Sequence, residues 1–347
     1  MTTLTCFITC HRKLPHSPKY LYSKYIYLPS FLLNSEHSLD DYCSNFTTSQ
    51  EGTFRWITGK LEQGKQTLAF ITGGAGVGKT YVMKALVAYC LAADKHVAKM
   101  APTGAAACLI NGQTIHSFFR LDGHLNCHMN RRDKWYEVVQ NTDVFFIDEV
   151  SMISEDLFDT IDNKLRECTG KQQLFGGKSV ILFGDPAQLP PMNKRPIWQD
   201  RFLAKFDVMV LKESKRQSDP AFIALLNRAR LGVLTYNDCE ELRKRIVPDT
   251  DIMDPRMSDA TILVPFRDLR DAFNRQFLET VPGNPKTYHA RDVDSNDRVI
   301  TGSTATFIRD NEKQWNLHPR TLQLKVGCRA MLLRNISVQD HWVNGQL

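Results

Sequence analysis

The segment from Ala69 to Leu86 constrains this chain more than any other part of it. It reads A-F-I-T-G-G-A-G-V-G-K-T-Y-V-M-K-A-L, a short apolar run followed by a glycine-rich turn and a helical pattern. The turn has the spacing of a phosphate-binding loop, in which backbone N–H groups surround a phosphate and the following helix presents its positive N-terminal end. The predicted phosphate-binding residues are Gly73, Gly74, Ala75, Gly76, Val77, Gly78, Lys79 and Thr80.

Two side chains of this turn carry chemistry. Lys79 can reach the β- and γ-phosphate oxygens of a bound nucleotide, and Thr80 offers a hydroxyl oxygen to Mg²⁺. The helix after the turn has its own support, because Val82, Leu86 and Cys90 recur every fourth residue on one apolar face. A chance glycine turn is the alternative, but the strand before it and the Lys-Thr pair favour a site for ATP and Mg²⁺.

A second apolar run ends in adjacent carboxylates. Residues Asp143 to Met152 read D-V-F-F-I-D-E-V-S-M, which predicts a buried strand that delivers Asp148 and Glu149. Open α/β sheets place ligands at the carboxyl ends of their strands, so both side chains are expected beside the phosphate loop. Asp148 is predicted to hold Mg²⁺ in its outer shell, and Glu149 to accept a proton from the water that attacks the γ-phosphate.

Two further predicted strands lead to polar residues that suit the same site. Ser179 to Pro191 reads S-V-I-L-F-G-D-P-A-Q-L-P-P, in which Gln188 can contact a phosphate or position water without adding charge. Val208 to Leu211 is followed by Arg216, whose planar guanidinium can grip the γ-phosphate across a domain cleft. The alternative for Arg216 is an exposed Lys-Arg pair on the surface.

Gln50 lies just upstream of the phosphate loop, where Phe54, Trp56 and Ile57 predict a short amphipathic helix. A glutamine amide can bond both N6 and N7 of adenine, so Gln50 is a candidate adenine reader. The alternative is an exposed glutamine at the start of a helix.

A stretch of small, hydroxyl and aromatic residues suggests contact with single-stranded DNA. Pro102 to Ala107 predicts a turn that opens a helix and lets a backbone phosphate approach closely. Hydroxyl groups can hold phosphates, and aromatic rings can stack on bases. The candidate DNA-binding residues are Thr103, Gly104, His116, Ser117 and Phe118. The alternative places Phe118 and Phe119 in the core, with His116 capping a turn.

Charge and composition narrow the function classes. The net charge of +6 and the pI of about 8.8 favour a polyanionic partner such as nucleic acid. Residues 120–140 form an irregular basic stretch, either a DNA-facing insertion or a solvated face. The nine cysteines are scattered without a C-x-x-C pair, which indicates a reduced, intracellular protein. No apolar run reaches the roughly 18 residues of a membrane span, so we expect a soluble protein.

The ordered motifs together resemble those of the Pif-type (petite integration frequency) helicases, which are relatives of RecD. They are G-G-A-G-V-G-K-T, A-P-T-G-A-A-A, T-I-H-S, I-D-E-V-S-M-I, F-G-G-K-S-V-I-L-F-G-D-P-A-Q-L-P-P and R-Q-S-D-P-A-F. The resemblance implies an ATP-driven helicase that moves 5′ to 3′ on single-stranded DNA and acts on DNA with a 5′ single-stranded tail. It further implies work in DNA repair, recombination or telomere maintenance, as a monomer, and, if the source is a eukaryote, in the nucleus or mitochondria.

The resemblance also implies the roles already assigned to six residues and the fold that carries them. The six are Lys79, Thr80, Asp148, Glu149, Gln188 and Arg216, whereas Gln50 fits the family's adenine-reading position less securely. The expected fold is an α/β P-loop NTPase. It comprises a poorly ordered basic extension over residues 1–46, a RecA-like parallel-sheet domain over 47–213, and an incomplete second RecA-like domain with a small β-barrel insert over 214–347.

Within the second domain the patterns predict individual elements. They are helices at Pro220–Leu231, at Asn237–Arg245 and through Leu269, Phe273 and Phe277, a first strand at Thr261–Val264, and two short strands joined by Gly327 within Leu322–Asn335.

The family's last two motifs do not occur before Leu347. We expect a chain without them to bind ATP but to show little DNA-stimulated turnover, because a two-domain motor works by closing on its nucleotide. Two other functions stay open at this point. One is a nucleotide-dependent DNA-binding module that does not unwind DNA, and the other is a P-loop kinase for a small molecule. The segment D-E-V-S-M and the glutamine turn argue against the kinase.

Overall fold

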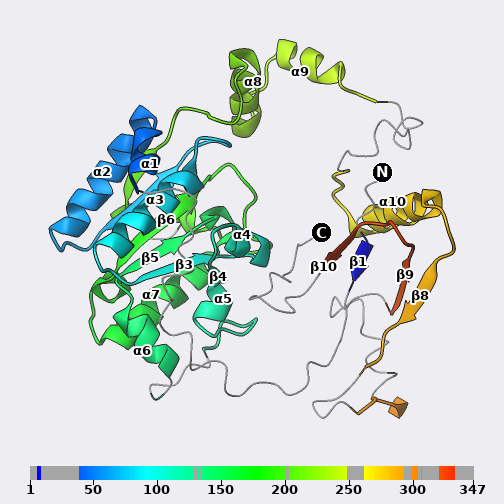
Figure 1. Ribbon diagram of the computed structural model, residues 1–347, viewed down its shortest axis with the longest axis horizontal. Helices are drawn as coiled ribbons and strands as arrows, with labels where there is room; N and C mark the ends of the chain where they lie inside the picture. The colour runs from blue at the N-terminus through cyan, green and yellow to red at the C-terminus, as the bar shows by residue number, and fades with distance from the viewer. Residues whose placement is uncertain are drawn as a thin grey trace. The chain divides into compact units, whose positions relative to one another are not determined.

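The computed structural model describes residues 6–8, 39–127, 132, 134–199, 203–247, 262–292, 298–303, 306 and 320–332. The chain forms two compact units, one of Pro15–Lys244 and one of Met1–Leu14 with Arg245–Leu347. Figure 1 shows the elements of both, and each unit is described by itself below.

The larger unit is built on a six-stranded sheet in which every pair of neighbouring strands is parallel. The strand order is β4-β3-β5-β6-β2-β7. The strands are β2 (Leu68–Thr72), β3 (Val97–Ala101), β4 (Gln113–Thr114), β5 (Val144–Ile147), β6 (Ser179–Gly184) and β7 (Asp207–Val210). The predicted α/β class with a RecA-like P-loop domain is therefore confirmed.

Helices cover both faces of this sheet, because successive residues of a buried strand point to opposite sides. Phe146 of β5 packs in one core, with α1 (Leu39–Ser44), α2 (Thr48–Glu62), α3 (Lys79–Ala92) and α4 (Gly104–Leu109). Phe145, its neighbour in sequence, packs in the other core, with α5 (Ile115–Phe118), α6 (Lys134–Asn141) and α7 (Glu155–Thr169). The continuous apolar runs in the sequence reflect this burial on two faces.

Short 3₁₀ helices and two outer helices complete the larger unit. The 3₁₀ helices are η3 (Val150–Met152), η4 (Leu174–Gly177), η5 (Ile197–Gln199) and η6 (Leu203–Lys205). The helix α8 (Pro220–Leu231) has the predicted bounds, because Asp219 caps its first turn and Gly232, in the left-handed conformation with φ of 72°, ends it. The helix α9 (Tyr236–Arg243) follows, one residue earlier at its start than predicted.

Several local expectations differ from the structure. A helix, α1, occupies residues that were expected to belong to a poorly ordered extension, because Tyr42 inserts into the core and its carbonyl accepts a hydrogen bond from Tyr81. The helix α6 overlaps the stretch expected to be irregular. Two large apolar residues of α8, Phe222 and Leu226, are 41% and 40% exposed.

The compact unit also continues beyond the expected domain boundary at Glu213. It does so because α8 is tied back to the sheet by an ion pair between Arg230 and Asp185.

The smaller unit contains α10 (Arg267–Thr280) and two pairs of strands. β8 (Lys286–His289) pairs with β9 (Thr321–Leu324) in antiparallel fashion, and β1 (Cys6–Ile8) pairs with β10 (Ala330–Leu332) in parallel. In this unit, Phe277 and Leu278 of α10 form a small apolar cluster, and Leu324 packs against them.

The predicted helix through Phe273 and the two strands on either side of Gly327 are confirmed. Residues 262–264 form no strand, contrary to expectation, and Thr261 and residues 333–335 lie outside the described part. Within the described ranges, no helix is both long and apolar enough to cross a bilayer.

Candidate active site

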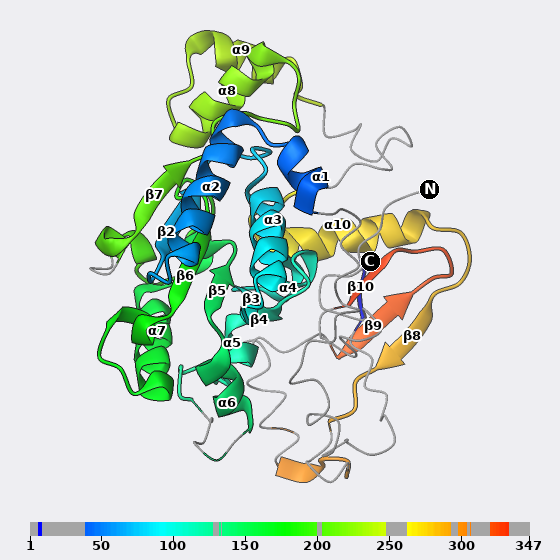
Figure 2. The same cartoon turned by 60° about the vertical axis from the view of Figure 1, so that its left-hand side comes forward.

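The candidate site lies where three neighbouring strands of the sheet end. Strands β5, β6 and β2 are adjacent and parallel, so their carboxyl ends meet at one edge. The phosphate loop follows β2, Asp148 follows β5 and Asp185 follows β6. Figure 2 shows these strands with α3 beginning at the same edge. Residues far apart in sequence are thus gathered by the strand order.

Two positions of the phosphate loop have neighbours so close that only glycine fits there. Gly76 has φ of 78°, and a Cβ there would lie 2.5 Å from Cβ of Arg216. Gly78 has φ of 81° at the start of α3, and a Cβ there would collide with the Gln50 amide. A side chain at either position would meet both backbone strain and a steric clash. Close packing against Arg216 and Gln50 therefore fixes the backbone of the phosphate loop.

Lys79 marks the centre of the site. Its Nζ donates hydrogen bonds to the carbonyl oxygens of Gly73 at 2.9 Å and Gly74 at 3.0 Å. Burial lowers the pKa of Lys79, while the negative charges of Asp185, Glu149 and Asp148 oppose that shift. Three carboxylates from two strand ends are therefore close enough to act on one ammonium group.

Asp148 has the environment of a metal ligand. Its side chain is only 6% exposed, and burial raises its pKa to about 6, although the Glu149 amide and the Thr80 hydroxyl donate hydrogen bonds to the carboxylate. A hydroxyl beside a desolvated carboxylate fits Mg²⁺, which prefers oxygen ligands. Within the described ranges no group of three or more His, Cys, Asp or Glu could hold a metal. Thr80 and Asp148 would therefore share Mg²⁺ with phosphate and water oxygens.

Glu149 has an unusual backbone conformation. Its φ of 50° and ψ of 43° are in the left-handed region, which few residues other than glycine adopt. The strain is held in place by tight packing, since a Cβ on Gly184 would lie 2.8 Å from Cγ2 of Val150. Strained backbone that the surrounding structure fixes is frequent at functional sites. The half-buried Glu149 carboxylate is thereby placed at the site edge with Lys79.

The turn after β6 carries Gln188. Its backbone N–H donates to the Asp185 carbonyl at 2.9 Å, and its side-chain amide lies 3.5 Å from the Asp185 carboxylate. The Gln188 side chain is exposed, whereas Asp185 is 1% exposed. The structure thus places Gln188 at the same edge as Lys79, on a turn held by a buried carboxylate.

Arg216 and Gln50 are arranged differently from their predictions. Arg216 belongs to the same compact unit as the phosphate loop, so it does not reach in across a domain cleft as expected. It is exposed and adjoins Gly76, where the Lys215 amide donates to the Gly76 carbonyl at 2.9 Å. Lys215 and Arg216 are both exposed, as the alternative of a surface Lys-Arg pair expects, and Arg216 lies beside the phosphate loop.

Gln50 is only 2% exposed, contrary to the alternative of an exposed glutamine. Its carbonyl accepts from the Thr47 amide at 3.0 Å, and its Nε2 donates to the Val77 carbonyl at 2.9 Å. The amide therefore holds the phosphate loop, and reading adenine would require it to give up these bonds. A capping box formed with Thr47 explains why the side chain turns inward.

The predicted DNA-binding residues divide into two groups. Phe118 is 5% exposed and packs edge-to-face against Phe119, Trp135 and Phe145, so its assignment as a stacking residue is wrong and the core alternative is correct. The remaining four, Thr103, Gly104, His116 and Ser117, are at least partly exposed.

The four remaining residues lie in two short helices or cap them: Thr103 and Gly104 begin α4, and His116 and Ser117 belong to α5. The Thr103 hydroxyl caps α4 by accepting from the Ala106 amide at 3.3 Å. His116 lies inside α5 instead of capping a turn, and burial lowers its pKa, with a further lowering by Lys194. Arg131, part of the predicted basic stretch, lies outside the described residues.

Sequence reasoning missed one residue of this edge altogether. Arg230 of α8 donates two hydrogen bonds to the Asp185 carboxylate. Its partner is 45 residues away, and nothing in the local pattern of α8 distinguishes Arg230 from its neighbour Arg228. No sequence signal available from one chain could have found it.

Comparison with known proteins assigns this site to a family. Residues 45–245 match the model of the family described as PIF1-like helicase. The chain belongs to this family. Among curated relatives it is similar to the ATP-dependent DNA helicase PIF1 of Saccharomyces cerevisiae (strain YJM789), with 29% identity over 301 residues that cover 80% of this chain and 33% of the relative. Against the mouse protein of the same name, identity is 32% over 298 residues, covering 80% and 42%.

The fold agrees with the same family. The crystal structure of Pif1 helicase from Candida albicans superimposes with a TM-score of 0.67 and 25% identity, covering 86% of this chain and 67% of that one. The chain spans well under half the length of the two curated PIF1-like relatives described above.

Proposed function

We propose that this chain binds and hydrolyses ATP and couples the reaction to 5′-to-3′ movement on single-stranded DNA and to unwinding of DNA. The observation that carries the proposal is the environment of Lys79. Its ammonium group donates hydrogen bonds to two carbonyls of the phosphate loop. It also interacts electrostatically with Asp148, Glu149 and Asp185. An ammonium group that now bonds to loop carbonyls can turn to phosphate oxygens when a nucleotide enters.

In the proposed reaction, Lys79 binds the β- and γ-phosphate oxygens and the loop amides surround the β-phosphate. Thr80 and Asp148 would hold Mg²⁺, and the ion would supply positive charge that stabilises the negative charge developing on the phosphates. Because burial favours the protonated carboxyl of Asp148, a cation beside it would restore the ionised form.

Glu149 is proposed as the general base and Gln188 as the residue that senses the γ-phosphate. Glu149 lies near Lys79 at the end of β5, from where it can accept the proton of an attacking water. Gln188 carries no charge, so hydrolysis can change its hydrogen-bond partner without leaving an ion unpaired. Arg216, beside Gly76, is proposed to stabilise the charge on the γ-phosphate.

DNA is proposed to bind through phosphate contacts with Thr103, Gly104, His116 and Ser117. These residues are exposed or partly exposed and follow β3 and β4, at the same sheet edge as the nucleotide site. Phosphate contacts do not read sequence, so binding should fall steeply with salt.

The remaining features are proposed from the family. They are action as a monomer on DNA with a 5′ single-stranded tail, roles in repair, recombination or telomere maintenance, and residence in the nucleus or mitochondria.

The test is phosphate release by the purified 347-residue chain with and without single-stranded DNA, followed by strand displacement on tailed duplexes. For a chain extended through the family's last two motifs, we expect DNA to stimulate hydrolysis and a 5′-tailed duplex to be unwound in preference to a matched duplex with a 3′ tail. The 347-residue chain alone is expected to bind ATP with little DNA-stimulated hydrolysis. Hydrolysis by the extended chain that ignores DNA would contradict the proposed coupling. ATP-dependent DNA binding without hydrolysis would instead identify a binding module.

A further inference from the structure

The helix α8 lies against the phosphate loop although none of the predicted site residues is on it. A Cβ placed on Gly74 would lie 3.4 Å from Oδ1 of Asn227 and 3.9 Å from Cδ of Arg230. Arg230 is therefore a neighbour of the loop that would surround a phosphate.

The guanidinium of Arg230 is fixed by Asp185. Its Nε donates to one carboxylate oxygen at 2.7 Å and its Nη2 to the other at 2.5 Å. The planar fork of arginine matches a carboxylate in this way, so both groups are held in orientation as well as in distance. The same carboxylate accepts the Ala187 amide at 3.1 Å and lies 3.5 Å from Nε2 of Gln188. Arg230 thus acts on the Gln188 turn through Asp185.

The negative charge of Asp185 makes its ion pair with Arg230 important for the binding of a nucleotide. Asp185 is 1% exposed, and its charge acts on Lys79 together with the charges of Glu149 and Asp148. A buried carboxylate so near to Lys79 is also near the place where phosphate oxygens would bind. Without a compensating cation it would repel a triphosphate, because like charges interact strongly where water is excluded.

Asp185 keeps its charge because of Arg230. Burial favours the protonated carboxyl, but hydrogen bonds from Arg230 and from the Ala187 amide, with the charges of Arg230 and Lys79, bring the pKa of Asp185 below its ordinary value. The carboxylate is therefore ionised and neutralised by the guanidinium at the same time.

We propose that Arg230 is a positioning residue of the ATP site, which neutralises and orients Asp185 so that a triphosphate can bind beside it. This inference rests on the proposed ATP site and adds a residue to it. Arg230 acts through Asp185, so changes at the two positions should not be independent. The charge of the arginine matters for nucleotide binding, and its fork geometry matters for holding the Gln188 turn.

The test is binding of a fluorescent, non-hydrolysable ATP analogue and of fluorescent ADP to the full chain with Mg²⁺ and without DNA. Arg230→Gln leaves Asp185 uncompensated and should weaken the triphosphate at least about tenfold, and the diphosphate less than about threefold. Adding Asp185→Asn to Arg230→Gln removes the surplus charge and should restore most of the triphosphate affinity. Arg230→Lys keeps the charge and should stay within about threefold of the parent.

The chain supplies a matched control. Arg228 on the same helix makes an equally bidentate pair with Asp238, both contacts 2.6 Å, but Asp238 caps α9 and no contact in the described part connects it to the phosphate loop. Arg228→Gln should leave both nucleotide affinities unchanged, and thermal melting of each variant separates unfolding from a binding defect.

Parent-like triphosphate binding in Arg230→Gln would overturn the inference. So would an Arg230→Gln, Asp185→Asn double variant no better than Arg230→Gln alone, or an Arg230→Lys variant as defective as Arg230→Gln. Failure of the parent to bind the ATP analogue would instead overturn the proposed ATP site itself. The binding test can be carried out even if the chain has no helicase activity, because the test requires neither DNA nor ATP hydrolysis.

Discussion

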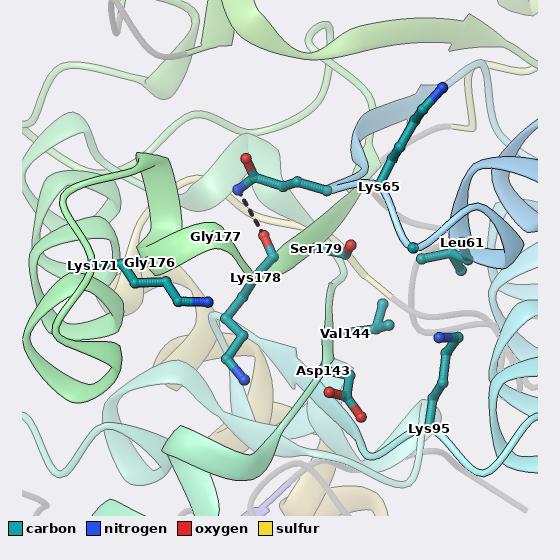
Figure 3. A pocket seen from close by; sticks show the side chains of 12 residues that line it. Leu61, Lys65, Lys95, Asp143, Val144, Lys171, Gly176, Gly177, Lys178 and Ser179 are labelled. Carbon is teal, nitrogen blue, oxygen red and sulfur yellow. Dashed lines mark hydrogen bonds between the residues drawn. The ribbon is translucent and has the colours of Figure 1, made fainter.

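The two edges of the six-stranded sheet both collect charged residues, but they use them in opposite ways. At the carboxyl edge, the charges of three carboxylates act on Lys79 beside the phosphate loop. At the amino edge lies a cavity of about 240 Å³ whose charged lining residues are Lys65, Lys95, Asp143, Lys171 and Lys178. Figure 3 shows these lysine side chains pointing in different directions and not toward one centre.

Several polar groups around the cavity have protein partners. Lys178 donates from Nζ to the Gln140 carbonyl at 2.6 Å, and the Gln66 amide donates to the carbonyls of Leu174 at 2.6 Å and Lys178 at 2.9 Å. Asp143 accepts from the His96 amide at 2.9 Å. Such bonds hold chain segments together. The convergence of charge on the phosphate loop, and not the presence of a cavity, therefore distinguishes the edge that we propose as the nucleotide site.

The largest difference between the edges should appear with Lys79→Ala. This change removes the cation expected on the β- and γ-phosphates, so hydrolysis should fall by about 10³-fold or more and ATP binding should weaken. Phosphate release and nucleotide titration measure both effects. Lys95→Ala at the amino edge is the control and should hydrolyse ATP like the parent. Normal turnover by the Lys79 variant would contradict the assignment of the site.

Glu149→Gln should give the next largest effect and separates chemistry from binding. Removing the general base should slow hydrolysis at least about 100-fold, while affinity for ATP with Mg²⁺ stays within about threefold of the parent. Single-turnover phosphate release and nucleotide titration give the two numbers. A loss of affinity equal to the loss of rate would mean that Glu149 holds the metal instead.

Asp148→Asn should stabilise the protein at neutral and alkaline pH. The folded pKa of about 6 exceeds the unfolded value of roughly 3.9, so folding opposes ionisation and the parent loses stability as pH rises through about 6. Without Mg²⁺, the asparagine variant should be more stable than the parent by about 3 kcal/mol at pH 8 and equal to it near pH 3. Urea unfolding in chelator at both pH values tests this, and a pH-independent difference would contradict it.

The smallest effect should come from the amino edge. Lys178→Met removes the hydrogen bond to the Gln140 carbonyl, which should lower the free energy of unfolding by about 1 kcal/mol or less. Nucleotide affinity and DNA-stimulated hydrolysis should not change. A tenfold change in either would show that the two edges are coupled, and would break the distinction drawn here.

The sequence by itself determined the elements in which chemistry and local structure coincide. The phosphate loop, the carboxylates after β5 and the glutamine turn after β6 are each a continuous strand and turn, so the pattern of a few neighbouring residues predicts both backbone and role. The helix α8 was predictable for the same reason, because Asp219, Pro220 and Gly232 are local signals for its ends. The parallel order of the strands then explains why these turns meet.

Only the tertiary structure decided which side chains face the site. Phe118 and Gln50 carry groups that suit DNA and adenine, but packing between α5 and the sheet buries the ring, and a helix cap turns the amide toward Val77. The pair of Arg230 and Asp185 joins residues 45 positions apart, and Arg228 is chemically identical to Arg230 in sequence. Burial and long-range pairing depend on where other elements pack, and that information is absent from any short stretch of the chain.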